Sequence, residues 1–211
     1  MKKLLMGIAA IILAGMLCNV ITEAKDTSAQ DVKFQQDISN KIIRFHVLAN
    51  SDSDEDQNLK LKVKDEILKY MQPRLSNSKS IEETKKILLS SDEHIKSIAN
   101  KVIKENGYNY SVNTELSNEN FPIKTYGNIT LPAGKYQAYR VLIGNAKGRN
   151  WWCVMFPPLC FIDITKGEVS QNESVNDMKK VLNDDEIDYI RNDEKIEYRF
   201  KIVDVVNKIF N

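Results

Sequence analysis

Residues 126–161 constrain the fold most, because they combine three β-favouring runs with strong turn signals. Pro132-Ala133-Gly134 fits a tight turn, since proline fixes φ at the second turn position and glycine relaxes the exit. Gly144 to Gly148 makes a longer connection, and Pro157-Pro158 must end a strand because proline cannot donate to a β-ladder. The pattern therefore predicts a three-stranded antiparallel meander within residues 126–164.

The N-terminus is typical of an exported protein. Lys2 and Lys3 precede an almost wholly apolar run from Leu4 to Ile21. This run fits a secretory signal peptide, but about 18 apolar residues also approach the length of a membrane-spanning anchor. We therefore assign residues 1–24 to a signal peptide or a membrane anchor and expect the remainder to be exported. Residues 25–40 are polar without clear periodicity, and we interpret them as a tether to a domain that spans residues 41–211.

Composition excludes several classes of function. The chain has 211 residues and a formal net charge of +1, whereas nucleic-acid binding requires a strongly basic face. The sequence contains no phosphate-binding loop, no dinucleotide fingerprint and no two-histidine metal motif. We therefore expect no nucleic-acid partner, no small-molecule substrate, no cofactor and no metal.

Hydrophobic periodicity predicts the remaining elements. A strand over residues 41–49 has Ile43, Phe45 and Val47 on one face and a mixed second face that includes Arg44 and His46. Two helices follow: one ends near Pro73, and the other runs from a capping box at Ser80 to Gly107 with a break expected near Ser90. Further predicted elements are a strand over 108–116, a helix over 184–192 and a closing helix whose segment 195–202 also suits a strand. This order predicts a single α+β domain, in which an antiparallel sheet (the N-terminal strand, the strand 108–116 and the meander) packs against helices.

The strongest catalytic candidate is His46, which shortly precedes Asn50-Ser51-Asp52. A Ser/His/Asp set suggests an exported hydrolase or amidase that uses His46 with Ser51 or Asp52. However, triads assemble from separate elements, and Ser51 lacks a Gly-x-Ser-x-Gly elbow. A structural His46 and a helix-capping Ser51 are therefore favoured, and the hydrolase is kept as the alternative.

Two residue pairs near the end of the meander have open interpretations. Trp151 and Trp152 are adjacent, so on a strand they point to opposite faces, and an exposed tryptophan beside Arg149 is typical of a partner-binding hot spot. The alternative is that the domain covers both rings. Cys153 and Cys160 form either a disulfide across the Pro157-Pro158 bend or two buried thiols.

Two strings in this sequence resemble the stage II sporulation protein R family. The first comprises Ile43 to Ser53, followed by Glu55-Asp56-Gln57 and Leu59 to Val63. The second is Asn150 to Phe161, accompanied by Tyr126-Gly127-Asn128 and Leu131 to Gly134. The resemblance covers roughly residues 42–164.

The resemblance implies a function that the residues alone do not indicate. Members of the family are made in the forespore and exported into the space between the two membranes of the developing spore. There they trigger a membrane-embedded aspartic protease, which removes the pro-sequence of the sporulation factor sigma-E. On this basis the chain is expected to be a secreted signal and not an enzyme, with membrane contact through its N-terminal segment if that segment stays uncleaved. A structural protein of the spore envelope is a further alternative.

The resemblance provides no contact residues, so the candidates for a receptor surface are our own inference. They are Arg44, His46, Asn50, Ser51, Asp52 and the exposed member of the pair Trp151 and Trp152.

Overall fold

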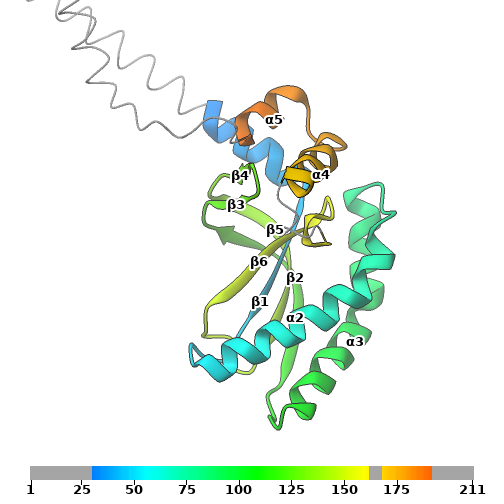
Figure 1. The fold of residues 1–211 in the computed structure, drawn as a ribbon, viewed down its shortest axis with the longest axis vertical. Coiled ribbons are helices and arrows are strands. Elements are labelled where there is room, and N and C mark those ends of the chain that lie inside the picture. The colour runs from blue at the N-terminus through cyan, green and yellow to red at the C-terminus, as the bar shows by residue number, and fades with distance from the viewer. Residues whose placement is uncertain (1–29, 162–167, 192–211) are drawn as a thin grey trace, which may run out of the picture.

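The computed structural model describes residues 30–161 and 168–191 (Figure 1). A helix over residues 30–41 comes first. The elements that follow, in chain order, are β1 (Ile43–Leu48), α2 (Asp54–Leu75), α3 (Ile81–Glu105), β2 (Val112–Phe121), β3 (Lys124–Tyr126), β4 (Ile129–Leu131), β5 (Gly134–Ile143), β6 (Asn150–Phe156), the short 3-10 helix η1 (Leu159–Phe161), α4 (Glu168–Lys179) and α5 (Asp184–Ile190). The α+β class predicted from the sequence is confirmed.

The main sheet is mixed, with strand order β2-β5-β1-β6. β1 runs parallel to β5 and antiparallel to β6, while β2 runs antiparallel to β5. β3 and β4 form a separate two-stranded sheet. The prediction of a purely antiparallel sheet was therefore wrong.

The predicted meander was also wrong, because β1 lies between β5 and β6. The connection between these two strands passes over the end of β1, where the Gly148 amide donates to the Ala49 carbonyl at 2.9 Å and the Lys147 amide donates to the Asn50 carbonyl at 3.3 Å. All six residues of β1 are buried, as expected for a central strand covered on both faces. The mixed second face of this strand had suggested that it is buried on one side and only partly covered on the other, whereas the structure buries both faces.

Helices α2 and α3 pack against one face of the sheet (Figure 1). The apolar stripe of α2 meets the odd-numbered residues of β1 in one hydrophobic cluster, which includes Phe45, Val47, Leu59, Val63, Ile67, Met71, Leu88, Ile95, Tyr139 and Val141. Pro73 lies within the last turn of α2, so the helix ends at Leu75, slightly later than predicted. The expected break at Ser90 does not occur, because its hydroxyl donates to the Ile87 carbonyl within a continuous helix.

A second hydrophobic cluster lies where the helix over residues 30–41, α4, α5 and the β3-β4 sheet gather at one end of the main sheet (Figure 1). Its members include Ile38, Ile42, Phe121, Leu131, Tyr136, Val154 and Ile187. The Lys41 ammonium lies 2.6 Å from the buried Glu186 carboxylate and so links the first helix to α5. The interpretation of residues 25–40 as a tether was wrong for the described part, because residues 30–41 form a helix that buries Ile38.

The strand predicted over 108–116 occupies Val112–Phe121, and Tyr108 and Tyr110 precede it as a stacked pair. The predicted helix over 184–192 is confirmed as α5. No helix among the described residues is long and apolar enough to cross a membrane. The apolar run of residues 4–21 and the segment 195–202 lie outside the described residues.

Candidate functional site

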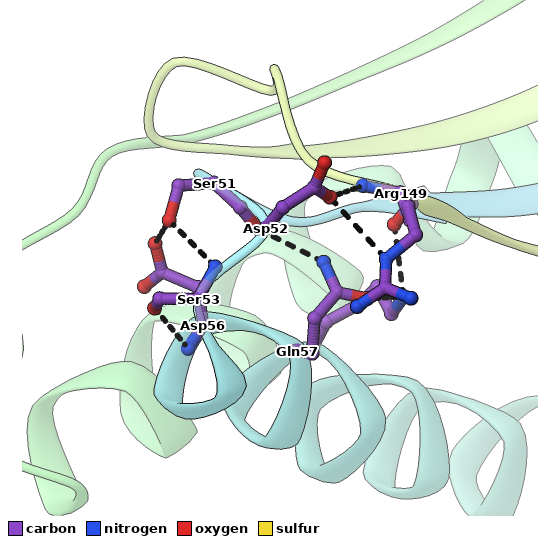
Figure 2. Close-up of polar contacts among 7 residues, drawn as sticks. Ser51, Asp52, Ser53, Asp56, Gln57 and Arg149 are labelled. Carbon is purple, nitrogen blue, oxygen red and sulfur yellow. Dashed lines mark hydrogen bonds and ion pairs between the residues drawn. The ribbon is translucent and has the colours of Figure 1, made fainter.

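Asn50, Ser51 and Asp52 form the corner between β1 and α2. Asp56, in the first turn of α2, accepts hydrogen bonds from this corner (Figure 2). One carboxylate oxygen of Asp56 accepts from the Ser51 hydroxyl at 2.5 Å and from the Asn50 amide group at 2.9 Å. Ser53 caps the helix, since its hydroxyl accepts from the Asp56 amide at 3.3 Å. The capping role predicted for Ser51 thus belongs to Ser53, and Ser51 instead fixes the start of α2 through its hydrogen bond to Asp56.

Asp52 holds this corner to the connection that crosses β1 (Figure 2). Its carboxylate accepts from the Arg149 backbone amide at 2.6 Å and lies 3.5 Å from the Arg149 guanidinium. The Gln57 side chain donates to the Ser51 carbonyl, and the buried Lys60 ammonium donates to the Arg149 carbonyl at 2.9 Å. Of the three predicted corner residues, Asp52 has the exposed side chain, at 62% of its full accessible surface.

The environment of the corner lowers the pKa values of two charged groups, the Asp56 carboxyl and the Lys60 ammonium. Burial opposes ionisation of Asp56, but the hydrogen bonds from Ser51, Asn50 and Tyr110 outweigh burial and lower the pKa of the Asp56 carboxyl. Burial lowers the pKa of the Lys60 ammonium, the nearby Arg149 charge lowers it further, and Asp52 opposes both effects. The buried polar groups of the corner are thus bonded to one another, whereas the side chains of Asp52 and Arg149 remain exposed.

Arg44 does not lie on the surface. Its guanidinium is fully buried among the rings of Phe121, Tyr126 and Tyr136, at 4.2, 5.7 and 5.0 Å from their centroids. It donates to the Tyr126 hydroxyl at 2.9 Å and to the Cys153 carbonyl at 3.3 Å. Burial lowers the pKa of Arg44. Direct contact with a partner is therefore excluded for Arg44 in this conformation, because aromatic residues distant in sequence enclose it.

His46 is buried as well, with 2% of its surface exposed. Its ring stacks on Trp152 at 4.9 Å and tilts against Phe121 at 5.2 Å. Burial, followed by the charges of Arg140 and Arg44, lowers the pKa of His46 to about 3. Neither ring nitrogen has a hydrogen-bond partner among the described residues, so the structure does not connect His46 to Ser51 or Asp52 as a triad requires.

The two tryptophans point to opposite faces of the sheet, as predicted, and both are partly buried. Trp151 packs on the helix-covered face, with its ring edge-on to Phe45 at 6.0 Å and the Lys64 ammonium 4.9 Å from its centroid. Trp152 lies on the other face between His46 and Lys124, whose ammonium is 5.7 Å from the indole centroid.

Comparison with known proteins identifies the family. The family model for stage II sporulation protein R matches residues 39–166. A relative from Bacillus subtilis (strain 168), stage II sporulation protein R, is 35% identical over 215 residues, which cover 95% of each chain. The chain belongs to the stage II sporulation protein R family. Its role therefore lies in sporulation. No solved structure matches the chain.

The two strings that carry the family resemblance meet in space. β1 and the corner belong to the first string, β6 belongs to the second, and these strands pair antiparallel with His46 opposite Trp152. Cys153 in the middle of β6 and Cys160 in η1 form a disulfide, with their Cα atoms 5.5 Å apart. This bond closes the Pro157-Pro158 bend, where the Phe156–Pro157 peptide is cis.

Several residues that build the site were not among the predicted ones. Asp56 was named only within the family string Glu55-Asp56-Gln57, although its position in the first turn of α2 allows it to bond back to the corner. Arg140 in β5 was not considered, yet it lies opposite His46 and pairs with Glu115 and with Glu119, the latter at 2.8 Å. No local pattern marks Arg140, because its partners come from other strands. Within the described residues, no group of histidine, cysteine and acidic side chains could hold a metal ion.

Proposed function

We propose that this chain is an exported signalling protein of endospore formation. It activates a membrane-embedded aspartic protease of the mother cell, which then removes the pro-sequence of sigma-E. One observation carries the proposal: the match to stage II sporulation protein R, a protein of the same family, extends over nearly the whole of both chains. The signal-like N-terminus, Lys2 to Ile21, supports export into the space between the two membranes.

The proposal assigns the chain a binding role and no catalytic one. His46 is enclosed by aromatic rings, and its low pKa keeps it uncharged at neutral pH. The hydroxyl of Ser51 donates to Asp56, so it lacks the adjacent imidazole that activates a serine nucleophile. Nothing in this geometry favours the hydrolase alternative.

Reconstitution in a bacterium that does not form spores tests the proposal. The membrane protease, its pro-sigma substrate and this chain are produced together, and the shortened sigma factor is followed on a gel. We expect processing only when the chain is present and carries its export segment. A matched strain that produces residues 25–211 without the segment keeps the chain inside the cell and is expected to process nothing. The absence of processing with a folded, exported full-length chain would contradict the proposal.

A further inference from the structure

The face of the main sheet opposite α2 and α3 carries a row of polar and aromatic side chains in strict register. Glu115 of β2 lies opposite Arg140 of β5, Arg140 lies beside His46 of β1, and His46 lies opposite Trp152 of β6. Neighbouring strands are about 4.8 Å apart, so Arg140 and Trp152 lie about 10 Å apart across the sheet. The helix over residues 30–41, α4, α5 and the β3-β4 sheet gather at one end of this face (Figure 1).

Trp152 is held in a fixed orientation on this face. Its indole stacks on His46 with an angle of 19° between the ring planes, and Phe121 meets it edge-on at 4.8 Å. The ring is nevertheless only partly buried. A rigid, partly exposed aromatic ring loses little conformational entropy on binding, which is why tryptophan is enriched among residues that dominate binding energy.

The segment that contacts this ring also carries an exposed apolar side chain. Ile123 is 64% exposed and sits in the turn between β2 and β3. Phe121 before it and Lys124 after it both contact Trp152, the latter through its ammonium at 5.7 Å. Ile123 therefore adds exposed apolar surface to the segment that contacts Trp152, with the Lys124 ammonium at the edge of the ring. We call Ile123, Lys124 and Trp152 the Trp152 face.

Several nitrogen atoms beneath this face are buried and unpaired in the part of the chain that the structure describes. Arg44 Nη1, Arg140 Nε and both ring nitrogens of His46 are buried without a hydrogen-bond partner among the described residues. The carboxylates that contact Arg140 are Glu115 and Glu119, whereas Arg44 donates only to a hydroxyl and a carbonyl. These buried atoms cannot reach a partner, and Arg140 is already paired with two carboxylates. The positive charge available to a partner is therefore the Lys124 ammonium at the edge of Trp152, and it favours a partner that supplies a carboxylate.

The other candidate surfaces are less suited to a partner. The polar atoms of the corner around Asp56 bond to one another, and Trp151 is engaged by Phe45 and Lys64. We propose that the chain contacts its partner through the Trp152 face, and that the partner is a protein segment with an apolar side chain next to a carboxylate. The apolar side chain packs against Trp152 and Ile123, and the carboxylate binds Lys124.

This inference rests on the proposed function, since the partner is the extracytoplasmic part of the membrane protease. Electrostatic complementarity of this kind contributes mainly to specificity and to the rate of association, while the rigid aromatic ring contributes most of the binding energy. The corner then serves to fix the register of β1 against β6 and so to orient Trp152.

The test uses Ile123→Asp and Lys124→Glu in the full chain within the reconstituted system. Both positions lie outside the hydrophobic clusters, so folding is expected to persist. Matched controls place the same changes on α3: Leu89→Asp, where the leucine is 58% exposed, and Lys101→Glu. We expect each change on the Trp152 face to reduce sigma-factor processing at least tenfold and each control to stay within twofold of the unmodified chain. Circular dichroism of the purified variants verifies folding.

A photo-reactive residue at position 123 identifies the occupant, with the same residue at position 89 as its control. We expect the protease to be captured from position 123 only. Processing within twofold of the unmodified chain for both Ile123→Asp and Lys124→Glu would overturn the inference, as would capture of a second copy of this chain in place of the protease. If the unmodified chain itself fails to support processing, the proposed function fails and this inference falls with it.

Discussion

Asp56 is predicted to be the most important polar residue for the stability of the fold. Asp56→Asn removes the charge that strengthens the hydrogen bonds from Ser51 and Asn50. It also replaces one carboxylate oxygen with an amide NH2, which cannot accept a hydrogen bond. A hydrogen bond to a charged group contributes about 1.5–3 kcal/mol. Because the new amide retains one acceptor oxygen, we expect a loss of about 2–4 kcal/mol in the free energy of unfolding. For a domain of this size, that corresponds to a decrease of roughly 4–16 °C in Tm.

The assay is urea unfolding followed by tryptophan fluorescence, with Asp54→Asn as the matched control. Asp54 lies in the same first turn but is exposed, so this change weakens only its interaction with the helix dipole, by up to about 1 kcal/mol. An Asp56→Asn variant within about 0.5 kcal/mol of the unmodified chain, which is the ordinary range for surface substitutions, would refute the reasoning.

Acidification provides an independent test of the same carboxylate. The folded state lowers the pKa of Asp56 below its ordinary 3.8, so its contribution to stability is fully present at higher pH. That contribution is lost as the pH falls below the ordinary pKa of 3.8 and then through the lower pKa of the folded state. The stability difference between the unmodified chain and Asp56→Asn should therefore shrink in this acidic range, and a constant difference would contradict the account.

Three further predictions concern the packing around β1. His46→Phe should reduce the loss of stability in acid, because the pKa of His46 falls from 6.5 to about 3 on folding. This shift costs the unmodified chain about 2 kcal/mol of stability at pH 5 relative to neutral pH. Equal pH profiles of the two chains in urea unfolding would contradict the prediction. Replacing Cys153 and Cys160 together by alanine should cost about 2.5 kcal/mol by loop entropy, and dithiothreitol should destabilise the unmodified chain but not the variant. Gly148→Ala should lower Tm more than Lys147→Ala, because a Cβ at position 148 would lie 2.1 Å from the Ser51 carbonyl oxygen. A loss below about 1 kcal/mol in the free energy of unfolding would contradict this, since it would show that the connection over β1 relaxes easily.

Local signals predicted the helices better than the sheet. The apolar stripe of α2 and the capping box at Ser80 depend on neighbours within a few residues, and α2 and α3 form largely where these signals placed them. Strand pairing depends on distant residues. The short connection after Gly144 suggested that its two flanking strands pair directly. In the structure this connection passes over the end of β1, where it bonds to the Ala49 and Asn50 carbonyls.

The candidate site was predictable only in part. Adjacency alone placed Trp151 and Trp152 on opposite faces, because side chains alternate along a strand. The burial of Arg44 could not be predicted from its charge, since its cage comes from residues 121–136, far away in the sequence. The same applies to His46, whose burial depends on packing between Phe121 and Trp152.

The central claim, that the chain activates a protease without performing catalysis itself, is tested most directly by His46→Phe in the reconstituted system. Phenylalanine preserves the stacking between Phe121 and Trp152 but removes both ring nitrogens, and so any general base at this position. We predict that the shortened sigma factor appears with the unmodified chain and with His46→Phe, and is absent without the chain. Loss of processing in a His46→Phe variant that is folded and exported would contradict the account.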